Sequence, residues 1–185
     1  MAIEHSLKHH FLLAMPGLAG EYFGNTITYV CEHNEDGAMG IMVNRPIGLT
    51  LGELLEQLGI EAAAALEQPV LEGGPVKRDR GFILHTDDRR YDASLSLGNG
   101  LMLSTARQTL ESIGAGDGPR QYLVALGYAG WGAGQLENEL TQNAWLSCPA
   151  QIEILFDVPF AERVNRAAAT LGIDFRLMSN QAGHA

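Results

Sequence analysis

The stretch from Gly37 to Pro46, GAMGIMVNRP, constrains the fold more than any other part of the chain. If it forms a strand, successive side chains alternate between two faces, and both faces are apolar. A strand of that kind is buried on both sides. It ends on Asn44 and Arg45, so two polar side chains are carried to the rim of the core. The pattern predicts a central buried strand with a candidate ligand site at its end.

Hairpins account for most of the other predicted strands. An alternating segment at 26–33 pairs with the central strand through a turn at 34–37. If that turn has four residues, Cys31 faces Gly40. A second hairpin turns at 98–100, where the sequence is Gly-Asn-Gly. Further strands are predicted at 10–15, 70–72, 80–86, 122–126, 152–156 and 175–178.

Helices are predicted between these groups of strands. Thr50 with Glu53, and Thr105 with Gln108, each match the capping box that starts a helix. Hairpins separated by helices indicate an α+β fold with one mixed, largely antiparallel sheet system. About four helices are predicted, at 51–58, 105–113, 135–145 and 158–171.

The chain has 185 residues, which suits a single domain over 1–185, with 1–9 and 179–185 expected to be mobile. Its formal net charge is −10, and its Lys and Arg residues are scattered. Nucleic-acid affinity depends on clustered basic residues that displace counterions, so we expect no direct nucleic-acid binding. The sequence shows no secretory signal and no apolar stretch near the ~20 residues of a membrane span. With two cysteines, it predicts a cytoplasmic protein with reduced thiols and no membrane partner.

Asn44 and Arg45 form the candidate site that the sequence favours most. Arg has a planar, permanently charged side chain that suits bidentate contacts with carboxylates or phosphates. An ion pair with one of the 22 acidic residues explains the same arginine equally well. Both interpretations of Arg45 stay open at this point.

The segment GYAGWGAG at 127–134 follows a predicted strand and precedes a predicted helix. Such a loop can cradle a phosphate with free backbone N–H groups. It lacks the pattern of a dinucleotide fingerprint or a P-loop, so a tight turn plugged by Trp131 is the favoured alternative. On the helix, Gln135, Glu139 and either Gln142 or Asn143 share one face. This polar stripe lines a cleft or faces solvent, and solvent is favoured.

His85 and Cys31 are the side chains closest to acid–base or nucleophilic chemistry. His85 ends an apolar strand, with Asp87 and Asp88 nearby to orient an imidazole as a general base. A histidine satisfied by the backbone is the favoured alternative. Cys31 and His33 share a strand face about 7 Å apart, beyond the reach that a Cys–His pair needs. A packed structural cysteine is therefore favoured.

Three rigid segments at 44–46, 73–75 and 127–134 are either polar or rich in glycine. Their convergence on one cleft is the simplest explanation. No nucleophile–base pair or set of metal ligands can be assembled from the sequence, so catalytic residues stay unassigned, and neither a metal nor a cofactor is expected. The ligand-binding residues predicted for the cleft are Asn44, Arg45, Gly73, Gly74, His85, Trp131 and Gln135.

Four segments together resemble the bacterial YqgE/AlgH family: FLLAMPGLAGEYF, VCEHNEDGAMGIMVNRP, GGPVKRDRGFILH and ALGYAGWGAGQLENELTQNAWL. The resemblance runs from about Lys8 to the end, and the closing QAGHA is similar to the AlgH branch. It implies a compact α+β domain whose branched sheet includes a small barrel, with helices around it. It implies no reaction and no catalytic residues. The family's label as a transcriptional regulator, linked to alginate production, came from genetics.

Two functions from different classes therefore remain. The first is a non-enzymatic regulatory protein that binds a small ligand or a protein partner. The second is an enzyme that acts on an anionic or phosphorylated small molecule in a cleft near Asn44, Arg45 and His85. The first is favoured, because the sequence offers no catalytic pair.

Overall fold

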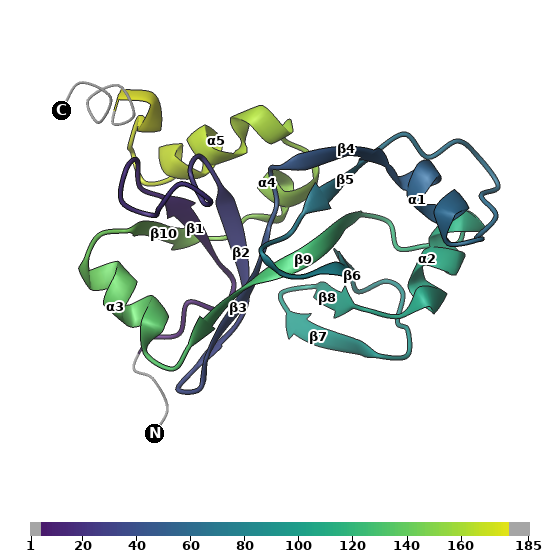
Figure 1. Ribbon diagram of the computed structural model, residues 1–185, viewed down its shortest axis with the longest axis horizontal. Coiled ribbons are helices and arrows are strands. Elements are labelled where there is room, and N and C mark those ends of the chain that lie inside the picture. Colours follow the sequence, from purple (N-terminus) through teal and green to yellow (C-terminus); the bar gives the residue numbers. More distant parts are fainter. Residues whose placement is uncertain (1–4, 178–185) are drawn as a thin grey trace. The chain divides into compact units, whose positions relative to one another are not determined.

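The computed structural model describes residues 5–177, which form two compact units. Within the described residues, the first unit comprises 5–44 and 129–177, and the second comprises 45–128. Strand β9 (Tyr122–Gly132) contributes to both units (Figure 1). Its first part pairs within the second unit, and its last part pairs within the first.

The first unit contains an antiparallel sheet with the strand order β10–β1–β2–β3–β9. The predicted central strand is confirmed as β3, and Ile41, Met42 and Val43 at its end are buried. The other strands are β1 (His10–Ala14), β2 (Ile27–Asn34) and β10 (Trp145–Pro149); β3 spans Gly37–Met42.

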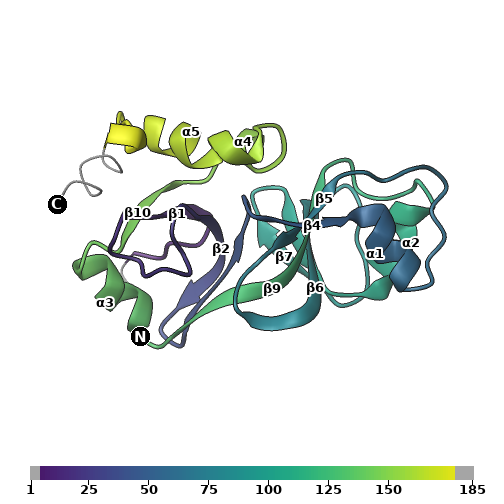
Figure 2. The same cartoon turned by 45° about the horizontal axis from the view of Figure 1, so that its top comes forward.

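Helices cover both sides of this sheet. Helix α3 packs against β3 and β10, and α5 packs against β1. The two helices lie on opposite sides of the strands in both views (Figure 1, Figure 2). The bounds are α3 (Gln135–Thr141), α4 (Ile152–Phe156), the 3-10 helix η1 (Phe160–Glu162) and α5 (Arg163–Ala169).

The second unit is a branched sheet centred on β9. Strand β9 pairs in parallel with β5 (Pro69–Glu72) and antiparallel with β6 (Val76–Thr86). Strand β4 (Pro46–Thr50) pairs with β5, while β8 (Leu101–Ser104) and β7 (Ser94–Gly98) continue outward from β6. Helices α1 (Leu51–Gln57) and α2 (Arg107–Gly114) complete the unit. Its core combines Leu51, Leu54, Leu55, Ile60, Val70, Ile83, Leu110, Ile113 and Val124.

The predicted α+β class and the mixed, largely antiparallel sheet are confirmed, and the sheet curls into a half-barrel. The described residues hold five α-helices, one 3-10 helix and a further helical segment at 175–177, rather than about four helices. The capping box at Thr50 is also confirmed. The side chain of Thr50 accepts the backbone N–H of Glu53, and the side chain of Glu53 accepts the backbone N–H of Thr50. The hairpin at 98–100 is present as β7–β8, with positive φ at all three turn residues.

The second predicted capping box is wrong. Helix α2 begins after Ala106, and no side chain caps it. The hydroxyl of Thr105 instead donates to the carbonyl of Ala93, 3.4 Å away. The side-chain oxygen of Gln108 accepts the backbone N–H of Asp92 at 3.2 Å. Both side chains therefore bond the segment just before β7. A local sequence pattern cannot reveal these contacts.

A bulge at Cys31 overturns the predicted pairing of Cys31 with Gly40. The register shifts between Val30 and Glu32, so Val30 faces Gly40 and Cys31 is the extra residue. The thiol of Cys31 is fully buried, and burial raises its pKa to about 12. A neutral, inaccessible thiol supports the interpretation of Cys31 as a packed structural cysteine.

The glycine-rich segment was predicted to be a loop, but residues 127–132 belong to β9. The glycines are needed where backbones approach closely. A Cβ at Gly37 would collide with the carbonyl oxygen of Trp131, and one at Gly73 would collide with that of Gly127. Within the 127–134 segment, a Cβ at Gly127 would collide with the carbonyl oxygen of Gly74, so close strand packing requires a glycine at that position.

Three further element predictions are wrong. Residues 152–156 form helix α4 instead of a strand, because a segment of five residues is too short to distinguish the helical period from the strand period. The helix predicted at 135–145 ends at Thr141, before Asn143 with its φ of 59°, and residues 145–149 form the unpredicted strand β10. The described part of the last predicted strand, 175–177, is helical. Strand β4 was not predicted at all.

Candidate functional site

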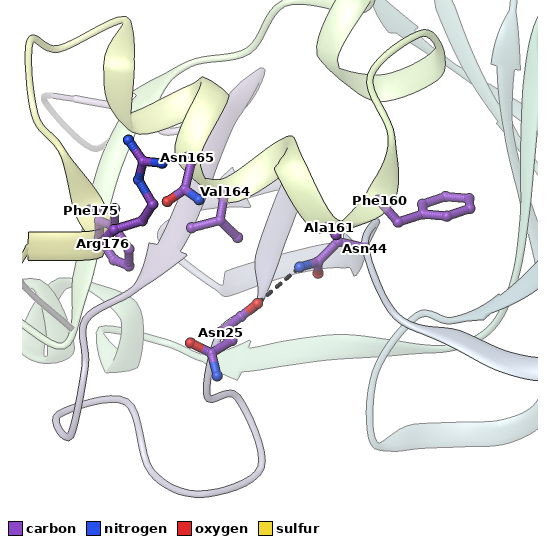
Figure 3. Close-up of a pocket in the computed structure, with 8 residues that line it drawn as sticks. All are labelled: Asn25, Asn44, Phe160, Ala161, Val164, Asn165, Phe175 and Arg176. Atoms are coloured by element: carbon purple, nitrogen blue, oxygen red, sulfur yellow. Dashed lines mark hydrogen bonds between the residues drawn. The ribbon is translucent and has the colours of Figure 1, made fainter. Parts of the chain in front are cut away.

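Asn44 follows β3 and ties the end of this strand to the start of β2. Its Oδ1 accepts the backbone N–H of Ile27 at 3.2 Å, and its Nδ2 donates to the carbonyl of Asn25 at 2.9 Å (Figure 3). An amide has two N–H groups and two acceptor lone pairs, so these bonds leave one of each. Asn44 is therefore held rigidly and retains hydrogen-bonding capacity.

Asn44 lines a cavity of about 390 Å³ in the first unit. This volume lies within the roughly 300–1,000 Å³ that is typical of small-molecule sites. Figure 3 shows Asn165 and Arg176 close together at one end and Phe160 at the other. The lining residues are Asn25, Asn44, Phe160, Ala161, Val164, Asn165, Phe175 and Arg176. We call this space the Asn44 cavity.

The lining combines a cation and three amides with apolar walls. Arg176 is the one charged residue among the described residues that line it. Its guanidinium contacts Asp174, with 3.3 Å between Nε and Oδ1, and this contact lowers the pKa of the Asp174 carboxyl. A guanidinium has five N–H donors, so one carboxylate does not saturate it. The chemistry suits an anionic group attached to an apolar body.

Arg163 fixes the residues next to the Asn44 cavity through hydrogen bonds. This role was not predicted from the sequence. Arg163 is only 3% exposed. Its Nη1 donates to the carbonyl of Val43 at 2.7 Å, and its Nε donates to that of Val158 at 2.8 Å. Its guanidinium also lies 4.4 Å from the ring centre of Phe160. Burial lowers the pKa of Arg163 to about 10, so it stays charged at neutral pH. It anchors the η1–α5 wall to the end of β3.

In the second unit, Arg45 forms an ion pair. Its Nη1 lies 3.6 Å from Oε2 of Glu72, and Arg78 approaches the other oxygen of that carboxylate at 3.7 Å. The backbone N–H of Glu72 donates to the carbonyl of Arg45, so β4–β5 pairing holds Arg45 beside Gly73. The ion-pair interpretation, left open by the sequence, is the one that these contacts favour.

His85 lies in the interior of the second unit and is 0% exposed. Its Nδ1–H donates to the carbonyl of Thr86 at 2.7 Å, so Nε2 accepts the hydroxyl of Ser104, also at 2.7 Å. This is the hydrogen-bonding geometry of a Ser–His pair. Ser104 is also 0% exposed, so substrate has no access to either group. Burial lowers the pKa of His85, which keeps the ring neutral.

Trp131 and Gln135 line a different cavity of the first unit, with a volume of about 320 Å³. Gln135, Glu139 and Gln142, which the sequence placed on one helix face, all line it. We call this space the Glu139 cavity. The polar stripe therefore borders a concave surface, although solvent exposure alone was favoured from the sequence.

The seven predicted site residues thus fall into two sets. Asn44, Trp131 and Gln135 belong to the first unit, and within it they line two cavities. Arg45, Gly73, Gly74 and His85 belong to the second unit. The convergence of both sets on one cleft stays a prediction.

The described residues contain neither a metal-binding cluster nor a membrane-spanning helix. Within 5–177, no group of three or more His, Cys, Asp and Glu side chains is placed to hold a metal ion. No helix in this range combines the length and the apolar character that a membrane crossing requires.

Comparison with known proteins identifies the family. Residues 11–176 match the family described as AlgH-like. The UPF0301 protein AlgH of Pseudomonas aeruginosa is 53% identical over 182 residues, which cover 97% of this chain and 96% of that protein. A UPF0301 protein of Thioalkalivibrio sulfidiphilus is 50% identical over the full length of both chains.

Solved structures agree with this match. The solution structure of AlgH from Pseudomonas aeruginosa has a TM-score of 0.79 and 51% identity, covering 100% of this chain and 99% of that one. The crystal structure of protein DIP2367 from Corynebacterium diphtheriae has a TM-score of 0.74. At 18% identity, over 97% and 94% of the two chains, it shows a shared fold alone. The chain described here belongs to the AlgH-like family.

Proposed function

We propose that this protein is a non-enzymatic regulatory protein whose Asn44 cavity binds a small anionic molecule with an apolar body. The observation that carries the proposal is the lining of that cavity. It brings Arg176 and three asparagine amides together with the walls formed by Phe160, Val164 and Phe175. Few polar groups among apolar walls are typical of small-molecule sites.

The anchoring of the cavity supports binding by a preformed site. Asn44 is held by two hydrogen bonds to the backbone, and Arg163 fixes the chain at Val43. Groups that are already ordered lose little entropy when a ligand arrives. The anion is recognised by Arg176, while the amide of Asn44 supplies a directed hydrogen bond.

The non-enzymatic part of the proposal rests on the environment of the Ser104–His85 pair. Acid–base catalysis needs a group within hydrogen-bonding reach of the substrate. His85 and Ser104 have the required mutual geometry but are sealed in the interior. The regulatory part rests on the resemblance to the YqgE/AlgH family, whose label as a regulator linked to alginate production came from genetics.

The proposal is tested with benzoate, phenyl phosphate and the neutral analogue benzamide, by isothermal titration calorimetry. We expect the anions to bind and benzamide to bind at least tenfold more weakly, because an ionic hydrogen bond contributes about 1.5–3 kcal/mol. Arg176→Gln should lower anion affinity about tenfold. Arg107→Gln, which removes a surface arginine paired with Glu111 in the second unit, should leave it within twofold.

Three results would overturn the proposal. Equal affinity of benzamide and benzoate, or the absence of any binding, would remove the anion site. Mass spectrometry of the recovered phenyl phosphate tests the non-enzymatic part, since its conversion by the wild-type protein would show an enzyme.

A further inference from the structure

The Glu139 cavity has a lining unlike that of the Asn44 cavity. Its walls come from the loop after β1, the last part of β9, and helix α3 with the residues that follow it. Among the described residues that line it, only Glu139 carries a charge. The lining residues are Leu18, Ala19, Gly20, Phe23, Gly130, Trp131, Gln135, Glu139, Gln142 and Ala144.

Three N–H donors hold the carboxylate of Glu139 in place. Oε1 accepts the indole N–H of Trp131 at 3.1 Å and that of Trp145 at 2.9 Å. Oε2 accepts the side-chain N–H of Gln135 at 2.9 Å, while the oxygen of the same amide accepts the backbone N–H of Gly132 at 3.0 Å. A carboxylate offers about four acceptor positions, so one position on Oε2 is left.

Aromatic rings surround this carboxylate. The rings of Trp131 and Trp145 meet edge to face at 5.8 Å, and Phe23 meets Trp145 at 5.3 Å. Phe23 and Trp131 also line the cavity. Phe23 and Trp131 therefore supply apolar walls for a ligand that reaches the carboxylate.

We propose that the Glu139 cavity is a second ligand site, which binds a small aliphatic molecule bearing a primary ammonium group. The ammonium donates one N–H to Oε2 of Glu139, and the side-chain oxygen of Gln142 accepts another. The aliphatic part lies against Phe23 and Trp131. Because the three donors fix the carboxylate beforehand, it need not reorder when the cation binds. The site is independent of the Asn44 cavity and selects the opposite charge.

Tryptophan fluorescence reports on this site directly. The sequence contains two tryptophans, and both donate to Glu139. We expect n-butylammonium to change the emission saturably, with a Kd on the order of 1 mM at low salt. Neutral n-butanol has a similar shape and should give no saturable change. Tetramethylammonium, which has no N–H to donate, should bind at least fivefold more weakly.

Matched variants separate a binding site from a purely structural carboxylate. Glu139→Gln keeps a side-chain oxygen that accepts both indole N–H groups but removes the charge, so affinity for n-butylammonium should fall at least tenfold. Glu153→Gln removes an exposed charge from α4 and should leave affinity within twofold. Arg176→Gln tests the other cavity and should not change amine binding.

The proposal is overturned if n-butanol and n-butylammonium give the same titration, if no saturable change occurs, or if Glu139→Gln binds the amine as the wild type does. Should Glu139→Gln lose its native circular dichroism, the wild-type titrations of n-butylammonium, n-butanol and tetramethylammonium decide the matter alone. Equal affinity for the three probes would then contradict an ammonium site.

Discussion

Arg163 and Glu139 are two charged side chains of the first unit that bond mainly to neutral groups. Arg163 donates to two backbone carbonyls and is 3% exposed. Glu139 accepts three N–H groups and lines a cavity. The first charge is enclosed by the protein, while the second keeps an open side. Burial, rather than the presence of charge, distinguishes a structural ion from one that is available to a ligand.

The largest expected effect comes from removing the enclosed charge. Arg163→Met keeps the apolar stem but leaves the carbonyls of Val43 and Val158 without their donor, which should lower the free energy of unfolding by about 3–5 kcal/mol. Urea denaturation measures the change. Arg166→Met, on an exposed position of the same helix, should change stability by less than about 0.5 kcal/mol. Equal losses of stability in the two variants would contradict a structural role for the buried charge of Arg163.

Truncating the carboxylate that lines a cavity should cost less. Glu139→Ala leaves the indole N–H groups of Trp131 and Trp145 without this acceptor, and we expect a loss of about 2–3 kcal/mol in the same urea assay. Glu139→Gln should recover most of that loss, since the amide oxygen accepts both bonds. A loss for Glu139→Gln as large as for Glu139→Ala would show that charge itself holds α3.

The pH dependence of stability tests the buried His85 of the second unit in the same way. The pKa of His85 is lowered in the folded state, chiefly by burial, so the fold favours the neutral ring. Its contribution to stability should be complete above the unfolded pKa of about 6.5 and should be lost as the pH falls toward the folded value. His85→Gln should therefore lose less stability than the wild type between pH 7 and pH 5. Parallel pH profiles of the two proteins would show that His85 does not titrate in this way.

The smallest effect on stability is expected at Arg176. Its side chain is 74% exposed and forms a surface pair with Asp174, so Arg176→Gln should leave the thermal unfolding midpoint unchanged within error. Differential scanning calorimetry provides the measurement. A clear fall in the midpoint would place Arg176 with Arg163 among the structural cations, and the Asn44 cavity would lose its proposed anion-binding group.

Local patterns predicted the parts of the fold that are determined locally. The Thr50–Glu53 capping box and the Gly98–Gly100 turn each depend on residues a few positions apart. Strand β3, whose last half is buried, and the polar rim at Asn44 also followed from a short run that is apolar on both faces. The bulge at Cys31 did not, because an apolar strand pattern contains no signal for one extra residue.

The rest of the candidate site depends on contacts between distant parts of the chain. Arg163 reaches a carbonyl 120 positions away, and nothing around it in the sequence points to Val43. Phe175 and Arg176 were assigned to a strand, whereas they belong to a helical segment that closes the cavity. Ser104 meets His85 only through the register of β6 and β8. Of the residues that line the Asn44 cavity, the sequence therefore predicted Asn44 but not the helical residues that form the wall.

The most direct test of anion binding at the Asn44 cavity is the NMR spectrum of the asparagine side-chain amides. On titration with benzoate, we expect saturable shifts of the signals from Asn25, Asn44 and Asn165, which line the cavity. Benzamide should shift them at least tenfold more weakly at equal concentration, and Arg176→Gln should weaken the benzoate shifts about tenfold. Unchanged amide signals at saturating benzoate, or shifts confined to residues outside the cavity, would contradict the proposed site.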